Sequence, residues 1–175
     1  MIEHKILFTG TTGAGKTTAI GGVSEVPPIS TDVRNTDSAF AKAMTTAGLD
    51  YGELTLDNGE TLRLYGTPGQ QRFDFMWRIL VEQALGLVIL IDNSRPDPLA
   101  DLRVYLDAFA DLLPTMNCAI GVGRTLECPV PTLDDFADLL AERDLAIPTL
   151  AVDVRERDDV LLLIDAILSQ AEAAA

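Results

Sequence analysis

Hydrophobic and polar positions along the chain follow two kinds of pattern, short apolar runs and longer amphipathic stretches. Residues 87–91 are continuously apolar, which is typical of a strand buried on both faces in a parallel sheet. Residues 51–57 and 60–65 alternate apolar with polar side chains around Asn58-Gly59, which predicts an antiparallel hairpin. Further short apolar runs predict strands over residues 5–9, 118–122 and 149–152.

Apolar side chains recur every three to four residues between these strands, which predicts amphipathic helices. The clearest apolar stripes are Phe73, Trp77, Leu80 and Val81 within residues 70–84, and Leu102, Leu106, Phe109 and Leu113 within residues 98–113. Other helices are predicted from residue 17 onward, over 132–143 and over 158–171. Strands that alternate with helices predict the α/β class, with a mostly parallel six-stranded sheet covered by helices on both faces.

Length and charge narrow the class of protein. The 175 residues suit one domain, and we expect a single domain over 1–175. With 27 acidic and 13 basic residues the net charge is −14, which repels nucleic acid and anionic membrane surfaces, so no nucleic-acid partner is expected. No apolar run approaches the length of a membrane span, and residues 1–5 lack the apolar core of a signal peptide.

The two cysteines show neither metal-ligand spacing nor a disulfide framework. Cys118 lies in an apolar run and is expected in the core, and Cys128 precedes a proline and is expected in a loop. We therefore expect a reducing, cytoplasmic location, with no integral membrane segment.

Residues 10–17 read Gly-Thr-Thr-Gly-Ala-Gly-Lys-Thr and match the phosphate-binding loop G-x-x-x-x-G-K-S/T, between a predicted strand and a predicted helix. Backbone N–H groups of such a loop point at the phosphates of a nucleotide, and the helix N-terminus adds to the positive field. We expect Lys16 to reach the β- and γ-phosphates and the Thr17 hydroxyl to bind Mg²⁺. The alternative is a chance glycine-rich turn before a helix. The residues of this region expected to contact the nucleotide are Gly10, Thr12, Gly13, Ala14, Gly15, Lys16, Thr17 and Thr18.

Two further stretches bear on the family. Residues 46–51 read Thr-Ala-Gly-Leu-Asp-Tyr, and residues 67–70 read Thr-Pro-Gly-Gln. With the phosphate loop, they make the chain resemble the small Ras-like GTPases in order along essentially its whole length. The first stretch is similar to the T-x-G-x-D-F/Y run of Rab-like switch I, and the second stands in the place of the switch II D-x-x-G-Q run.

The resemblance implies a Ras-like G domain of the P-loop NTPase class that binds GTP and GDP with Mg²⁺. It implies that Thr46 binds Mg²⁺ through its hydroxyl and senses the γ-phosphate through its N–H. Gly69 would donate its N–H to the γ-phosphate, and Gln70 would orient the attacking water, which makes Gln70 and Lys16 the expected catalytic residues. Thr46 is also open to interpretation as an ordinary polar residue of a loop.

Departures from the family pattern narrow the resemblance. Gly66 replaces the aspartate that opens D-x-x-G, and the run Tyr-Gly-Thr-Pro-Gly-Gln at 65–70 looks like the bacterial gliding-motility (Mgl) and actinobacterial conservon GTPases. Metal binding would then depend on Thr17, Thr46, phosphates and water. Asp92 is either an outer substitute for the missing aspartate or a cap for the following loop.

The base-recognition loop departs most from the family. The family's N-K-x-D run would end at Leu126, and Glu127 follows one residue late. Arg124 would stack its stem on the base or lie solvated at the surface. Asp153, in the place of the family's S-A-K run, is a second candidate to face the purine. Guanine is therefore implied by the resemblance, while the choice between GTP and ATP stays open.

The same comparison suggests a slow enzyme with a protein regulator. Thr12 stands where many small GTPases have glycine, which predicts slow intrinsic hydrolysis. Arg34 and Arg72 are candidates for an arginine finger supplied by the chain itself, or ordinary surface charges.

The implied regulator is a roadblock-type protein, with conservon-like sensor components as the alternative. We expect Phe75 and Met76 to lie outside the helix over 70–84 as part of a docking surface, unless they pack on the neighbouring helix. The competing function is a degenerate nucleotide-binding interaction module with little hydrolysis.

Overall fold

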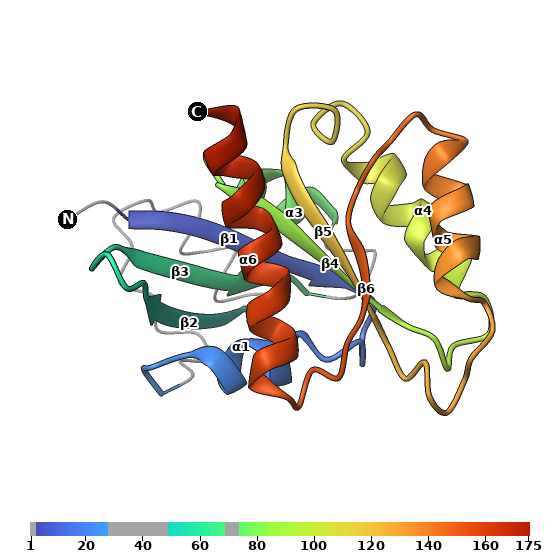
Figure 1. Ribbon diagram of the computed structural model, residues 1–175, viewed down its shortest axis with the longest axis horizontal. Coiled ribbons are helices and arrows are strands. Elements are labelled where there is room, and N and C mark those ends of the chain that lie inside the picture. The colour runs from blue at the N-terminus through green and yellow to red at the C-terminus, as the bar shows by residue number, and fades with distance from the viewer. Residues whose placement is uncertain (1–2, 28–48, 69–73) are drawn as a thin grey trace.

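The structure, a computed structural model, describes residues 3–27, 49–68 and 74–175 (Figure 1). One sheet has the strand order β2-β3-β1-β4-β5-β6, in which β2 runs antiparallel to β3 and every other neighbouring pair is parallel. The strands are β1 (Glu3–Gly10), β2 (Asp50–Thr55), β3 (Thr61–Gly66), β4 (Gly86–Asp92), β5 (Asn117–Gly123) and β6 (Thr149–Ala151). The predicted six-stranded, mostly parallel sheet is confirmed.

Five helices within the described residues cover both faces of this sheet. They are α1 (Lys16–Val23), α3 (Asp74–Val81), α4 (Pro98–Ala108), α5 (Leu133–Ala141) and α6 (Arg157–Ala174). Helices α1 and α6 pack on one face, where α6 crosses in front of the sheet in Figure 1, and α3, α4 and α5 pack on the other. This is the α/β architecture of a Ras-like P-loop G domain. None of these helices is long and apolar enough to cross a membrane.

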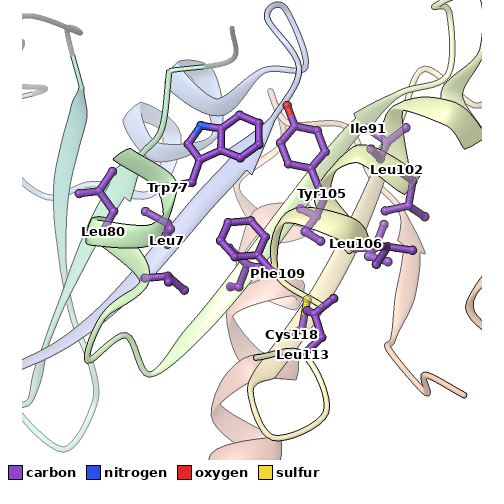
Figure 2. Close-up of a cluster of buried hydrophobic side chains, with 14 of the residues drawn as sticks. Leu7, Trp77, Leu80, Ile91, Leu102, Tyr105, Leu106, Phe109, Leu113 and Cys118 are labelled. Atoms are coloured by element: carbon purple, nitrogen blue, oxygen red, sulfur yellow. The ribbon is translucent and has the colours of Figure 1, made fainter. Parts of the chain in front are cut away.

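The two faces of the buried strand β4 supply two separate cores. Leu87, Ile89 and Ile91 face the helices α3 to α5, whereas Val88 and Leu90 face α1 and α6. On the first side the Trp77 and Tyr105 rings lie 4.9 Å apart between their centroids, and α4 brings its apolar residues against the strands (Figure 2). Because both faces are covered, every residue of β4 is apolar or buried, which explains the continuous run in the sequence.

The two interpretations of the α3 surface each hold for one residue. Phe75 is 55% exposed, as a docking surface requires, whereas Met76 is buried in the same core cluster as Trp77 and Leu80, which agrees with the alternative that it packs inside the protein. Helix α3 ends at Val81, three residues before its predicted end, where Gln83 adopts a left-handed backbone with φ of 59°. Phe73, also expected on the core face, lies outside the described residues.

Helix α4 stops at Ala108, five residues before its predicted end. Beyond it the chain continues in turns in which the Leu112 and Leu113 N–H groups both donate to the Phe109 carbonyl. Phe109 and Leu113 are nonetheless buried, because these turns keep roughly the helical spacing of apolar side chains.

The chain itself covers part of the outer edge of β2. The N–H of Glu25 donates to the Glu53 carbonyl at 2.8 Å, and the Glu53 N–H donates to the Ser24 hydroxyl at 3.1 Å. The Thr55 N–H donates to the Glu25 carboxylate at 3.2 Å. Three outward-facing backbone groups of this edge strand are therefore bonded to the segment that leaves α1.

Candidate nucleotide-binding site

The loop between β1 and α1 is held in a tight turn by its glycines. Gly10 has φ of +147°, and a Cβ there would lie 2.2 Å from the Leu90 carbonyl oxygen of the neighbouring strand. Gly15 has φ of +99°, and its Cβ would lie 2.5 Å from the Val154 side chain. The Ala14 N–H closes the turn on the Thr11 carbonyl at 3.0 Å. These contacts show why glycine is needed at both ends of the predicted phosphate loop.

Lys16 lies buried across this loop, with 7% of its surface exposed. Its Nζ donates to the Gly10 carbonyl at 2.6 Å and to the Thr11 carbonyl at 2.8 Å. Burial lowers the pKa of Lys16 from 10.5 to about 8, and the nearby Asp50 carboxylate partly opposes that shift. The structure thus places a cation inside the loop, where its charge is little screened by water.

Nucleotide affinity is expected to depend on pH through Lys16. In the nucleotide-free protein the ammonium loses its proton as the pH rises through about 8, whereas phosphates favour the protonated form. Binding therefore takes up a proton above that pH, and the affinity for GDP should fall by up to about tenfold per pH unit. Fluorescence titrations of GDP across the alkaline range measure this slope, and Lys16→Arg, which stays protonated, should remove it. An equal slope in both proteins would contradict the assignment.

The lowered pKa of Lys16 has the opposite effect on the stability of the nucleotide-free protein. Between about 8 and 10.5 the unfolded chain binds a proton at Lys16 that the folded protein does not. The contribution of Lys16 to the free energy of unfolding therefore rises with pH across that window, while nucleotide affinity falls.

The side chains of Thr17 and Asp50 place two oxygen atoms that could bind a metal ion side by side at the start of α1. The Thr17 hydroxyl donates to Asp50 Oδ2 at 2.6 Å. In the antiparallel register of β2 and β3, Asp50 lies directly opposite Gly66, and a Cβ at Gly66 would lie 3.1 Å from Asp50 Oδ2. The Asp50 carboxylate thus occupies the space beside the position where the family pattern has its aspartate. Sequence reasoning missed this role, although Asp50 is the aspartate of the T-x-G-x-D run.

This donor pair fits Mg²⁺. The ion prefers hard oxygen ligands and keeps several waters, so in nucleotide sites it takes few protein side chains together with phosphate oxygens. A hydroxyl and a carboxylate next to Lys16 supply such ligands. In the described ranges there is no group of three His, Cys, Asp or Glu side chains that would hold a metal without a nucleotide.

A cavity of about 520 Å³ opens beside the phosphate loop. Three segments of the chain form its walls. They are residues 13–15 together with Thr18, residues 123–127 at and after the end of β5, and residues 151–155 at and after the end of β6. Of the expected nucleotide contacts, the structure brings together Gly13, Ala14, Gly15, Thr18, Arg124 and Asp153 in these walls. The cavity follows the phosphate loop at the carboxyl ends of the strands, which is where open α/β sheets bind ligands.

Asp92 caps the loop that follows β4, as one of the two sequence interpretations had it. Its Oδ1 accepts from the Ser94 N–H at 2.9 Å and from the Ser94 hydroxyl at 2.6 Å. Its Oδ2 lies 3.2 Å from Nη1 of Arg124. Arg124, with φ of 59°, is therefore neither freely solvated nor far from the cavity, because Asp92 and Ser94 hold its guanidinium at the cavity wall.

Asp153 is bound within its own loop. Both of its carboxylate oxygens accept from the Arg155 guanidinium, the shortest contact being 2.6 Å, and this partner lowers the pKa of Asp153 to about 2. The Asp153 N–H donates to Asp159 Oδ2 at 2.8 Å. At the other wall, Leu126 is 96% exposed.

A second, smaller hollow of about 220 Å³ lies between the phosphate loop and α4. Thr11 and Thr12 line it on one side and Trp77 and Tyr105 on another. Arg95 also lines it and is paired with Asp101 at 2.6 Å. Thr12 therefore lines a space that the phosphate loop shares with Trp77 of α3 and Tyr105 of α4.

Several predicted site residues lie outside the described residues. They are Arg34, Thr46, Gly69, Gln70 and Arg72. Their proposed roles stay predictions.

No protein-family model matches the chain. Among curated proteins it is similar to the Ras-related protein Rab-44 of Homo sapiens, with 28% identity over 127 residues, 70% of this chain. The Ras-related protein RabC of Dictyostelium discoideum is 29% identical over 101 residues, 54% of this chain. This distant similarity supports a Ras-like small GTPase. A further relative is the uncharacterized protein MJ1339 of Methanocaldococcus jannaschii, 29% identical over 93 residues and 53% of each chain.

The matched regions are less than half of each of these Ras-related proteins. The alignments cover 11% of the length of human Rab-44 and 45% of RabC.

Proposed function

We propose that the protein is a nucleotide-dependent molecular switch that binds GTP and GDP with Mg²⁺ and hydrolyses GTP slowly. The observation that carries the proposal is the Thr17–Asp50 oxygen pair next to the buried Lys16, in a phosphate loop whose residues 13–15 line a cavity of about 520 Å³. A merely structural glycine turn has no need for a buried cation beside two metal-type oxygens. These groups together match the needs of a nucleoside polyphosphate.

The residues divide the work of phosphoryl transfer. Lys16 and the N–H groups of the loop neutralise charge on the phosphates, and Gln70 positions the attacking water. Thr17 and Asp50, with Thr46, would hold Mg²⁺, which when bound neutralises charge between the phosphates. Asp50, on the adjacent strand, would thereby take the role of the aspartate that the family has at the position of Gly66.

We assign the protein to the bacterial Mgl-like or conservon-like branch, on the run of residues 65–70 and the shift of the carboxylate to β2. A roadblock-type regulator, or a sensor component, would dock at the switch regions. Phe75 and Ile79 support a docking surface, because both are exposed and lie one turn apart on α3. The free thiols of Cys118 and Cys128 are compatible with a reducing cytoplasm.

Hydrolysis is expected to speed up when Thr12 is replaced by glycine. The Thr12 side chain lines the hollow between the phosphate loop and Trp77, and glycine at this position would leave more room for the attacking water. Thr12→Gly should raise the single-turnover rate of GTP hydrolysis by about tenfold, with little change in GDP affinity. Thr115→Gly, the same change at an exposed threonine far along the chain from the phosphate loop, serves as the control. An unchanged or slower rate in Thr12→Gly would count against this role.

The proposal is tested by competition between GTP, GDP and ATP for the nucleotide-stripped protein with Mg²⁺. Tight binding of GTP and GDP that depends on Lys16, followed by slow release of phosphate from GTP, is the expected result. Binding without measurable hydrolysis would favour the second function, a nucleotide-binding interaction module. That alternative has one specific observation in its favour, the exposed Leu126 at the position of the family's base-reading aspartate. No binding of any nucleotide would overturn both.

A further inference from the structure

One wall of the large cavity, residues 123–127, belongs to a loop that buries little of its own surface. The loop runs from the end of β5 to the start of α5, and every residue from 123 to 132 is at least partly exposed. Leu126 and Val130, two of its apolar residues, are both exposed. A segment with few buried apolar contacts opens easily unless hydrogen bonds hold it. The position of this wall therefore depends on the hydrogen bonds that the loop makes.

Asn93, directly after β4, bonds to the loop on both sides of this wall. Its backbone N–H donates to the Gly123 carbonyl at 3.0 Å. Its side-chain Nδ2 donates to the Cys128 carbonyl at 2.6 Å and to the Pro131 carbonyl at 3.0 Å. Because residues 124–127 lie between the first two of these carbonyls, a single residue fixes the wall at both ends.

The Asn93 side chain makes these bonds at the expense of its own oxygen. The residue is 2% exposed, and its Oδ1 has no hydrogen-bond partner among the residues that the structure describes. Only the NH2 group of an amide can donate to two carbonyls, so the reverse orientation would place the oxygen against both of them. A buried acceptor without a partner disfavours folding. What the amide holds, more than the stability of its own position, therefore explains its presence here.

Asp92 and Ser94, on either side of Asn93, fasten the start of the loop through Arg124. Asp92 Oδ2 lies 3.2 Å from Nη1 of Arg124, and this Nη1 donates to the Ser94 hydroxyl oxygen at 3.1 Å. Within the described part of the chain, the hydrogen bonds that reach residues 124–131 from outside the loop all come from Asn93 and Ser94. We call Asp92, Asn93 and Ser94 the β4 clasp.

We propose that the β4 clasp, with Asn93 as its main positioning residue, holds the nucleoside-side wall in place and thereby sets how long a nucleotide stays bound. With the phosphates at residues 13–15, the nucleoside would extend toward residues 123–127 in the same cavity. Asn93 does not line the cavity, so it acts through the loop. A wall that is in place before binding loses little freedom, whereas a loose wall lowers the affinity by the fraction of molecules that have it in place. This inference rests on the proposed function, since it takes the cavity as the nucleotide site.

The test measures the release of fluorescent GDP, in the presence of Mg²⁺, from wild type and from Asn93→Ala. The variant keeps the backbone bond to Gly123 and loses both side-chain bonds, so release should become about 10- to 100-fold faster. Binding of inorganic tripolyphosphate, measured by competition, should stay unchanged, because this ligand has no nucleoside and needs only the phosphate loop.

Ser94→Ala is a second variant of the clasp. Ser94 is exposed, so its replacement leaves the fold intact, and it removes only the hydroxyl that accepts from Arg124. Release of GDP should become about threefold faster, the effect of one hydrogen bond. Should Asn93→Ala not fold, this variant decides alone.

Asn117→Ala is the matched control. Asn117 begins β5, at the end of the strand opposite to the loop, and its Nδ2 donates to the Leu85 carbonyl at 2.8 Å. The control thus also removes a bond from an asparagine amide to a backbone carbonyl, but away from the cavity wall. It should release GDP at the wild-type rate, and thermal unfolding compares the loss of stability among the variants.

Wild-type release rates in the folded clasp variants would overturn the inference and leave the proposed function intact. Equal weakening of GDP and tripolyphosphate by Asn93→Ala would overturn it too, because a general loss of structure has that effect. Release that is accelerated as much by Asn117→Ala would have the same meaning. If wild type binds neither GDP nor tripolyphosphate, the proposed function itself is overturned.

Discussion

Asp50→Asn is expected to weaken the Mg²⁺-dependent part of GTP and GDP binding by about 10- to 100-fold, the effect typical of removing a group that supports a bound metal. Asparagine keeps an oxygen that accepts from the Thr17 hydroxyl, so the hydrogen bond between α1 and β2 persists. What is lost is the negative charge. Titrations of fluorescent GDP at a series of Mg²⁺ concentrations separate this loss from nucleotide affinity without metal, which should change little.

A paired variant decides whether the carboxylate has moved between strands. Gly66→Asp alone should crowd the site, because a Cβ at that position lies 3.1 Å from Asp50 Oδ2 and 3.0 Å from Ile20 Cδ1. The double variant Asp50→Ala with Gly66→Asp removes the contact with Oδ2, while the Cβ at position 50, also 3.1 Å away, and the flexible end of Ile20 must shift slightly. It should recover part of the Mg²⁺ dependence that Asp50→Ala lacks. If Asp50→Asn binds Mg²⁺ and GDP as wild type does, the assignment of Asp50 to the metal is wrong.

Gly10→Ala is expected to lower the free energy of unfolding by about 3 kcal/mol or more. Its Cβ would lie 2.2 Å from the Leu90 carbonyl oxygen, and a backbone atom in the sheet has no alternative rotamer. The φ of +147° adds strain for any residue with a side chain. The expected result is a lower denaturant midpoint in urea, with loss of nucleotide affinity even where the variant is folded, because β1 and β4 must separate.

Gly13→Ala is the internal control for that measurement. Gly13 also has positive φ, of +84°, but a Cβ there meets no atom within 4 Å. It should cost only about 1 kcal/mol, the strain of the backbone alone. Equal losses for the two alanines would mean that the contact with Leu90 has relaxed and does not determine the effect.

The fold followed from the sequence because its signals are local. The continuous run of β4 reflects burial on both faces, and the Asn58-Gly59 turn, with Gly59 at φ of +84°, joins β2 to β3 as predicted. Open alternatives and errors arose where periodicity alone cannot decide. Met76 sits next to Trp77 on a helix surface wide enough to bury both, and the turns after Ala108 repeat apolar residues at helical spacing without forming a helix.

The same distinction between local and long-range signals applies to the residues of the site. The phosphate loop is contiguous, so its motif identified Lys16 and Thr17 directly. The relation of Asp50 to Gly66 depends on the register of two antiparallel strands, 16 positions apart in sequence, and no local pattern encodes it. Likewise, only the structure shows that Asp153 forms an ion pair with Arg155, because a sequence gives the charges of two residues but not their partners.

The cover that Ser24 and Glu25 give to β2 has a consequence for how the protein behaves at high concentration. An open edge strand invites the same strand of another molecule, which is a common start of aggregation. Here the Glu53 and Thr55 groups that such a neighbour needs are already bonded within the chain. At the opposite edge β6 is only three residues long, too short to template much pairing. For β2 to pair with a strand of another molecule, the hydrogen bonds of Ser24 and Glu25 to β2 would first have to break. This cost disfavours fibre formation in concentrated solutions of the protein.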